Sequence, residues 1–225
     1  IAAENNLSET AFVSIHENPV SIRWFTPSIE VDLCGHATLA SARILFDYYP
    51  DRAGEEINFD SKSGNLKVTK CNDGLCLNFP ADQPIEKKLD SLFIEILDIE
   101  PLKLLRGKDD YLAIFKNQKQ IEDMQPKLFL LKKINARGLV ISAPGDEVDF
   151  VSRCFYPEAG IEEDPVTGSA HTMLTPYWAN QFNKEDLEGH QLSKRGGKLN
   201  CRLVNDRVCI SGNSVIYFEG TISIV

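Results

Sequence analysis

The chain has 225 residues, with 24 basic and 33 acidic side chains that give a formal net charge of −9. This acidic balance argues against nucleic acid or an anionic membrane surface as the main partner. No stretch approaches the roughly 18 consecutive apolar residues of a membrane helix, and the first residues lack the basic segment that opens a signal peptide. We therefore expect a cytoplasmic globular protein, with 43% hydrophobic residues to build its core.

Strands punctuated by turns make up most of the predicted structure. Residues 66–70 and 75–79 alternate apolar and polar side chains around Cys71-Asn72-Asp73-Gly74, which predicts a β-hairpin. Further strands are expected, in chain order, at residues 111–116, 138–143, 148–155, 199–204, 207–211, 214–218 and 221–225.

Four helices are predicted among these strands. Helical periodicity marks residues 86–97 and 126–134, and two further helices follow glycines, at residues 37–48 and 169–180. The helix at 37–48 is rich in Ala and Leu nearly all round, which is typical of a helix enclosed on most sides. The sequence thus predicts an α+β protein with two mostly antiparallel sheets, each curled like a barrel around a central helix.

An internal repeat relates the two halves of the chain. Arg23-Trp24-Phe25-Thr26-Pro27 precedes an acidic loop and Gly35, and Arg153-Cys154-Phe155-Tyr156-Pro157, 130 residues later, precedes an acidic loop and Gly168. The second loop carries a three-residue insertion. Self-similarity over so long a period favours a tandem duplication, with chance similarity as the alternative because few letters match.

The duplication predicts two similar lobes, residues 1–98 and residues 99–225, with the last strand pairing back with the first lobe. If the second unit begins near residue 100, its counterpart begins about 30 residues before Ile1. We therefore expect a strand and one or two turns to precede the present chain.

Six cysteines are scattered along the chain without metal-binding spacing. No C-x2-C pair occurs, and no His pair has zinc-finger spacing. We interpret these cysteines as reduced and mostly buried thiols: Cys34, Cys71, Cys76, Cys154, Cys201 and Cys209.

The two repeated loops each end at a predicted helix N-terminus. Such an end presents free backbone N–H groups and the positive end of the helix dipole, and glycine lets an anion approach closely. If the two lobes face each other, both ends would point into one cleft and could hold a substrate carboxylate. The alternative is ordinary capping by Thr38, Thr167 or Ser169.

Three side chains near these loops are candidates for proton transfer. His36 lies in the first turn of a helix, where the dipole would keep the imidazole neutral. Asp164 precedes the second helix, and Pro165 holds the backbone of Asp164 extended. The alternative is that Asp164 is a loop carboxylate that merely caps the helix. Glu9 is a weak candidate for proton transfer on its sequence pattern alone, since an exposed charged residue is the simpler interpretation.

Several of these motifs resemble the PhzF-like isomerase family of phenazine biosynthesis. The most specific is Glu163-Asp164-Pro165-Val166-Thr167-Gly168-Ser169-Ala170-His171, and the likeness extends over essentially the whole chain. Family members typically begin with a strand segment that this chain lacks. Weaker matches lie at residues 6–12, 25–27, 34–38, 149–153, 191–197 and 212–220.

The resemblance implies a diaminopimelate-epimerase-like fold with an active site between the lobes. The family's catalytic glutamate, histidine and aspartate fall on Glu9, His36 and Asp164. The glutamate, with a pKa raised by burial, would move a proton between carbons of a small carboxylic acid, without metal or organic cofactor. A homodimer is also expected. Substrate binding is assigned to Ser8, Gly35, Ala37, Thr167, Gly168 and Ser169.

Three other functions are alternatives to this one. Related racemases use two opposed cysteines, but only Cys34 is present and Thr167 stands at the second position, where a hydroxyl is far too weak an acid. A serine hydrolase is disfavoured because Ser169 lacks the G-x-S-x-G elbow. A non-catalytic adaptor is the alternative from another class, since one vertebrate member of the family is named for binding a WD-repeat protein.

Arg195 could approach the cleft or form a surface ion pair.

Overall fold

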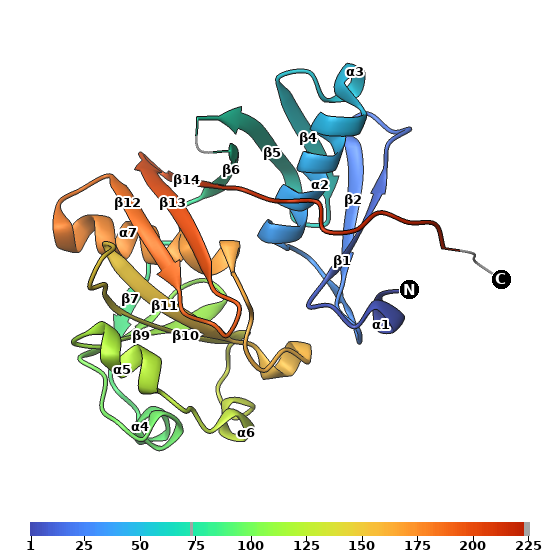
Figure 1. Cartoon of the computed structure of the whole chain (residues 1–225). Coiled ribbons are helices and arrows are strands. Elements are labelled where there is room, and N and C mark those ends of the chain that lie inside the picture. Colours follow the sequence, from blue (N-terminus) through green and yellow to red (C-terminus); the bar gives the residue numbers. More distant parts are fainter. Residues whose placement is uncertain (73, 223–225) are drawn as a thin grey trace.

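The computed structural model describes residues 1–72 and 74–222, in which each half of the chain folds as a curled sheet beside one long helix (Figure 1). The first half contains β1 (Thr10–Ser14), β2 (Val20–Phe25), β3 (Glu30–Val31), β4 (Glu56–Ser61), β5 (Gly64–Cys71) and β6 (Gly74–Pro80). The second contains β7 (Ile85–Lys87), β8 (Lys103–Arg106), β9 (Asp110–Ile114), β10 (Gly138–Pro144), β11 (Phe150–Phe155), β12 (Asp186–Gln191), β13 (Gly197–Val204) and β14 (Arg207–Gly212).

Two long helices, α2 (Gly35–Tyr48) and α7 (Gly168–Phe182), each lie in one half of the molecule (Figure 1). Both start at the glycine that closes a repeated loop. The shorter helical segments are α1 (Ala2–Asn5), α3 (Pro50–Ala53), α4 (Ser91–Leu97), α5 (Gln118–Asp123), α6 (Leu128–Leu131) and the 3-10 turn η1 (Pro157–Ala159).

The strand order confirms the duplication. Hydrogen-bonded strands run β1-β2-β4-β5-β6-β14-β13-β12-β11-β10-β9-β8-β7, so the first five strands are mirrored by β10 to β14. The direction of pairing is mirrored too, because β1–β2 and β10–β11 are antiparallel whereas β2–β4 and β11–β12 are parallel. The two expected sheets are joined, since β6 and β14 pair antiparallel from Leu75 opposite Gly212 to Pro80 opposite Arg207.

The division into lobes at residues 98 and 99 stays a prediction. Strand pairing favours an earlier boundary, between β6 and β7, because β7 pairs with β8. Helix α4 agrees with this, since Phe93, Ile96 and Leu97 pack with strands of the second half. The last described strand, β14, pairs with β6 of the first half.

The repeated arginines make the same contacts in both copies. Arg23 donates from Nε and an Nη to the two carboxylate oxygens of Glu30, at 2.8 and 2.9 Å, and Arg153 binds Glu163 in the same way at 2.7 and 3.0 Å. Each guanidinium also lies over a phenylalanine ring of its own strand, about 5 Å from the centroid. Such bidentate pairs fix the direction of the loop that leads to each helix.

Two apolar cores stabilise this arrangement. The larger joins α2 and α7 to both halves of the sheet, and includes Trp24, Phe59 and Trp178. The smaller fills the space between β8–β11 and the short helices α4, α5 and α6. Because the larger core spans both halves, it holds the starts of α2 and α7 in a fixed relation.

Two predicted helices are shorter than expected. Helix α4 begins at Ser91 because the side chain of Asp90 accepts the Leu92 N–H at 2.9 Å, whereas residues 85–87 pair as β7. The helix expected at 126–134 is reduced to Leu128–Leu131. The helical periodicity of the sequence therefore overestimated both helices: residues 85–87 form a strand, and the segment 126–134 has only a short helix.

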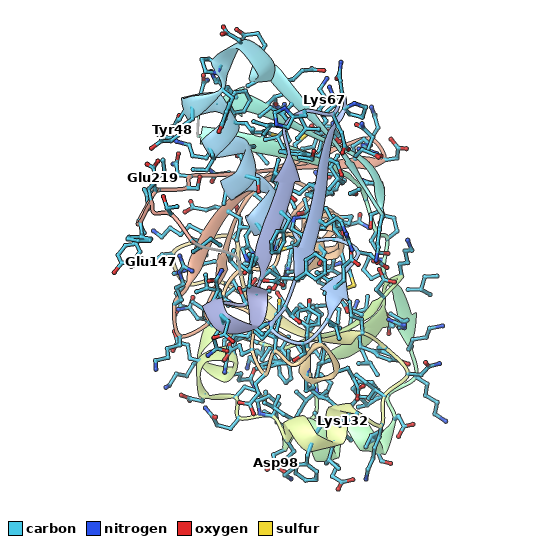
Figure 2. All side chains as sticks on the ribbon, turned by 90° about the vertical axis from the view of Figure 1, so that its right-hand side faces the viewer. Tyr48, Lys67, Asp98, Lys132, Glu147 and Glu219 are labelled. Atoms are coloured by element: carbon cyan, nitrogen blue, oxygen red, sulfur yellow. The ribbon has the colours of Figure 1, made fainter. Side chains whose placement is uncertain are left out.

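The prediction of strands at residues 214–218 and 221–225 is wrong for the residues that the structure describes, which end at residue 222. Residues 213–222 form no ladder, and Tyr217 is 99% exposed. The segment runs from β14 past α2, where the Tyr48 hydroxyl donates to Glu219 at 3.0 Å (Figure 2). Residues 223–225 lie outside the described part of the chain. Alternating side chains make a strand only where a neighbouring strand supplies the hydrogen bonds.

The cysteines are free thiols, as predicted, although fewer are buried than expected. Cys34, Cys154 and Cys201 are buried, Cys76 and Cys209 are half-buried, and Cys71 is exposed.

Replacing Arg153 should destabilise the protein far more than replacing its counterpart Arg23. The Arg153 side chain is 11% exposed and also donates to the carbonyls of Ile121 and Met124, so Arg153→Ala leaves Glu163 and two carbonyls without partners. We expect a loss of about 3 kcal/mol in the free energy of unfolding, measured by urea denaturation. Arg23→Ala is the matched control, and equal losses for both would contradict this interpretation.

Candidate active site

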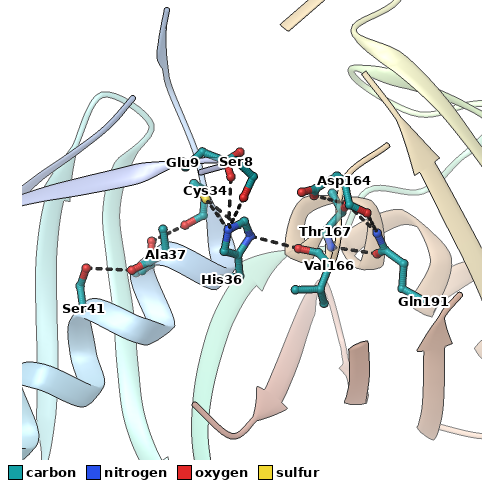
Figure 3. A network of polar contacts seen from close by, with 11 residues as sticks. Ser8, Glu9, Cys34, His36, Ala37, Ser41, Asp164, Val166, Thr167 and Gln191 are labelled. Atoms are coloured by element: carbon teal, nitrogen blue, oxygen red, sulfur yellow. Dashed lines mark hydrogen bonds and ion pairs between the residues drawn. The ribbon is translucent and has the colours of Figure 1, made fainter. Parts of the chain in front are cut away.

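The two repeated glycines meet face to face. A Cβ atom built on Gly35 would lie 3.2 Å from the Cα of Gly168, and one built on Gly168 would lie 3.2 Å from the Cα of Gly35. The absence of side chains therefore lets the starts of α2 and α7 touch. The two helix ends open onto one shared site (Figure 3).

The first-turn N–H groups of both helices are not capped by the residues before them. Cys34 and Thr167 occupy the N-cap positions in extended conformations, and neither side chain makes a capping hydrogen bond. The Thr38 hydroxyl donates to the Cys34 carbonyl at 2.6 Å instead. Ordinary capping by Thr38 or Thr167 is thereby excluded, and the N–H groups of Gly35 and Ala37 have no intrahelical acceptor.

His36 links the two halves across the site. Its Nδ1 atom lies 3.1 Å from the Val166 carbonyl oxygen, which belongs to the loop before α7. Its Nε2 atom lies 3.2 Å from Oε2 of Glu9 and 3.5 Å from the Ser8 hydroxyl. Both ring nitrogens therefore face acceptors, an arrangement that suits the doubly protonated imidazolium.

Glu9 immediately precedes β1 and points inward, with 10% of its side chain exposed. Burial raises the pKa of its carboxyl, but the contacts with His36 and Ser8 outweigh burial, so that the net pKa lies below 4.5. Burial lowers the pKa of His36, while Cys34 and the Glu9 carboxylate raise it by more, and the net pKa lies above 6.5. Glu9 and His36 thus form an ion pair at neutral pH.

Two sequence-based expectations about ionisation are therefore wrong. Glu9 was expected to have a raised pKa and His36 to be neutral. Burial and the helix dipole alone would have these effects, but the charge that each residue places beside the other reverses both.

Asp164 lies on the other side of the site, held by the loop before α7. Its carboxylate accepts a hydrogen bond from the Thr167 hydroxyl, and its Oδ1 atom is buried without a partner. Burial raises its pKa to about 6, although His36 and Thr167 act in the opposite direction. Asp164 therefore changes charge near neutral pH, unlike Glu9.

Gln191 positions this loop, and the sequence reasoning did not single it out. Its buried amide donates from Nε2 to the Asp164 carbonyl at 2.7 Å, and its Oε1 accepts the Thr167 N–H at 2.8 Å. Both ends of the segment from Asp164 to Thr167 are thus tied to β12. The one sequence signal was its place at the start of residues 191–197, a segment that resembles the PhzF-like family.

Arg137 is a second residue that was missed. Its guanidinium pairs with the buried Asp110 and donates to the Ser169 hydroxyl at 3.0 Å. Matching the two halves by strand register reveals it. Thr10 pairs with Phe25 in the first half, and Leu139 pairs with Phe155 in the second, so Thr10 and Leu139 are equivalent positions. Ser8 and Arg137 each lie two residues before these positions; Ser8 contacts His36, and Arg137 contacts Ser169.

Cys34 and Arg195 have limited roles in this geometry. Cys34 is buried, and burial raises the pKa of its thiol, so it is a neutral neighbour of His36 rather than a reactive thiolate. Its counterpart at the start of α7 is Thr167, and the pair of thiols that a two-cysteine racemase needs is therefore missing. Arg195 is exposed and has no ion-pair partner among the described residues.

The chain matches the family described as phenazine biosynthesis-like protein (PhzC-PhzF) over residues 1–220. It belongs to this family. An uncharacterized isomerase of Pseudomonas aeruginosa is 45% identical over 222 residues, which are 99% of this chain and 85% of that relative. The name of this relative supports an isomerase-type function for the chain.

Solved structures agree. A PhzF family protein of Enterococcus faecalis superposes with a TM-score of 0.93 and 40% identity, over 99% of this chain and 85% of that one. A predicted epimerase of Pseudomonas aeruginosa, 16% identical, has a TM-score of 0.64 over 94% of this chain and 82% of its own, and it shares the fold. The family and the diaminopimelate-epimerase-like α+β fold are confirmed. None of the helices in the described residues is long and apolar enough to cross a membrane.

The ion pair between Glu9 and His36 can be tested by NMR. We expect His36 to titrate above pH 6.5 in the wild type, and its pKa to fall in Glu9→Gln because the neutral amide no longer favours the imidazolium. The buried His171, whose pKa burial lowers to about 4, is the internal control and should be unchanged. An unchanged His36 titration in the variant would show that Glu9 does not hold its charge.

Proposed function

We propose that the protein is an isomerase that moves a proton between two carbons of a small carboxylic acid, using side chains rather than a metal or organic cofactor. The observation that carries the proposal is the meeting of two carboxyl groups with opposite pKa shifts at paired helix N-termini. Pairs of titratable groups driven apart by their environments are typical of acid–base sites.

Glu9 is the proposed base. Its lowered pKa keeps it ionised at neutral pH, and His36 holds the carboxylate in place at 3.2 Å. The carboxylate would take a proton from one carbon of the substrate, become neutral, and return the proton to another carbon. Because the same group accepts and donates, the reaction needs no net exchange of protons with other residues.

Asp164 is the proposed hydrogen-bond donor. With a pKa of about 6 it is partly protonated near neutral pH, and its unpartnered Oδ1 atom is free to carry that proton. A neutral carboxyl group could donate to the enolate-like oxygen that forms when a carbon beside a carboxyl group loses its proton.

The helix ends are the proposed site for the substrate carboxylate. The N–H groups of Gly35, Ala37 and Gly168 lie at the positive ends of two helices. Ser169 adds a hydroxyl whose oxygen already accepts from Arg137 at 3.0 Å, so its own proton is free to reach an anion. Ser8 and Thr167 complete the proposed set of binding residues.

A homodimer and a cytoplasmic location remain predictions. Sedimentation of the purified protein would detect the dimer.

Glu9→Gln should greatly slow carbon-bound proton exchange. We expect the rate of solvent deuterium incorporation into a panel of small unsaturated carboxylic acids to fall by about 10²- to 10⁴-fold, the usual contribution of a positioned acid–base group. Glu4→Gln, which changes an exposed glutamate near the same end of the chain, is the matched control and should exchange like the wild type. Equal exchange by Glu9→Gln and the wild type would remove Glu9 from the mechanism and favour a non-catalytic adaptor.

The pH dependence of exchange should report both carboxyl groups. Ionised Glu9 is lost as the pH falls through its lowered pKa, and protonated Asp164 is lost as the pH rises through about 6, so the rate should decline on both sides of a maximum that lies below pH 6. Asp164→Asn keeps a donor at every pH and should lose only the decline on the alkaline side, while Asp164→Ala should be slow throughout. An alkaline decline that persists in Asp164→Asn would assign it to another group.

A further inference from the structure

The turn between β12 and β13 lies directly against the loop that carries Asp164. Gln191 and Gly197 pair with each other at the two ends of this turn, and Gln191 lies beside Asp164 (Figure 3). Lys194 and Arg195 stand at the tip of the turn. Two basic side chains are therefore carried next to the proposed substrate site.

Contacts with that loop fix the shape of the turn. The Ser193 hydroxyl donates to the Pro165 carbonyl at 2.7 Å and accepts the Gly196 N–H at 3.0 Å. Gly196 has a φ of +77°, a conformation that favours glycine. A Cβ atom on Gly197 would lie 2.6 Å from Cγ2 of Val166. One glycine thus allows the turn, and the other lets it pack closely against the loop.

The two basic side chains at the tip are exposed and available to a ligand. Neither Lys194 nor Arg195 forms an ion pair with a carboxylate among the residues that the structure describes. The net charge of −9 and the ionised Glu9 both repel an anionic substrate, and cations at the rim of a site offset such repulsion. Arginine also presents a planar pair of N–H donors that matches a carboxylate.

We propose that Arg195 binds a second anionic group of the substrate, which is therefore a dicarboxylic acid. The inference rests on the proposed function, in which the starts of α2 and α7 bind one carboxylate. Val166 connects the two places, because its carbonyl oxygen lies 3.1 Å from Nδ1 of His36 and its side chain lies against Gly197 at the end of the turn. One carboxylate would lie at the helix ends and the other at the tip of the turn.

The binding of pentanedioate and pentanoate tests the inference without any reaction. The two acids have the same carbon chain and differ by one carboxylate. At constant ionic strength we expect the wild type to bind pentanedioate about 10-fold more tightly in calorimetry, the least that a hydrogen bond between charged groups usually contributes. Both acids should shift the NMR signals of the His36 ring, which reports binding at the site.

Arg195→Gln should bind pentanedioate no more tightly than pentanoate, because a neutral amide does not pair with the second carboxylate. Its unchanged affinity for pentanoate would verify that the variant is folded, and Arg195→Lys should retain part of the preference. Arg202→Gln is the matched control and should keep all of it, since Arg202 is an exposed arginine further along β13 that pairs with Asp186.

Three results would overturn the inference. The first is a wild type that binds the two acids equally or binds neither. The second is a preference for pentanedioate that survives in Arg195→Gln. The third is binding of pentanedioate that leaves the His36 signals unchanged.

Exchange kinetics give a second readout with the unsaturated acids pent-2-enedioate and pent-2-enoate. Arg195→Gln should raise KM for pent-2-enedioate about 10-fold and leave kcat unchanged, since a contact remote from the reacting carbons stabilises the ground state and the transition state alike. The KM for pent-2-enoate should not change.

The inference and the proposed function fail separately. If pentanedioate binds through Arg195 but Glu9→Gln exchanges deuterium normally, the second carboxylate site stands and the proposed isomerase mechanism does not. If Glu9→Gln loses exchange but Arg195→Gln binds both acids as the wild type does, the reverse holds.

Discussion

The whole site depends on the contact between two backbones at Gly35 and Gly168. A Cβ atom on either residue would come within 3.2 Å of the other Cα, closer than side-chain carbons normally approach a neighbouring chain. Since nothing separates the two helix starts, His36 on one half can reach the Val166 carbonyl on the other. The mirrored Arg–Glu pairs, which hold the two loops that lead to these glycines, therefore contribute to the site from a distance.

Duplication produced a symmetric frame and an asymmetric site. Strand order and pairing direction are mirrored about the β6–β14 junction, but the residues at matched positions differ. Where the first half has Ser8 and Glu9, strand register gives the second half Arg137 and Gly138. His36, the second residue of α2, corresponds to Ser169, the second residue of α7. The first half thus supplies an ion pair, and the second supplies a guanidinium and a hydroxyl.

Local patterns predicted much of this frame. The repeat, the two glycine turns and the helices that became α2 and α7 could be found because each is encoded within a few adjacent residues. The pairing of residues 85–87 as β7 could not, because it depends on a strand that lies nearly twenty residues further along the chain. The same is true of Gln191 and Arg137, whose partners Thr167 and Ser169 are 24 and 32 residues away in sequence.

The ionisation of the site shows why pattern alone fails at function. The positive end of a helix carries about half an elementary charge, and on that basis His36 should be neutral. A full carboxylate charge 3.2 Å from its Nε2 atom acts in the opposite direction, and at such short range its attraction exceeds the repulsion of the dipole. Asp164 receives no such close cation and keeps the raised pKa that burial gives it. One cation placed beside one of two carboxyl groups is therefore enough to keep the first ionised while the second remains partly protonated, which is the difference that the proposed mechanism uses.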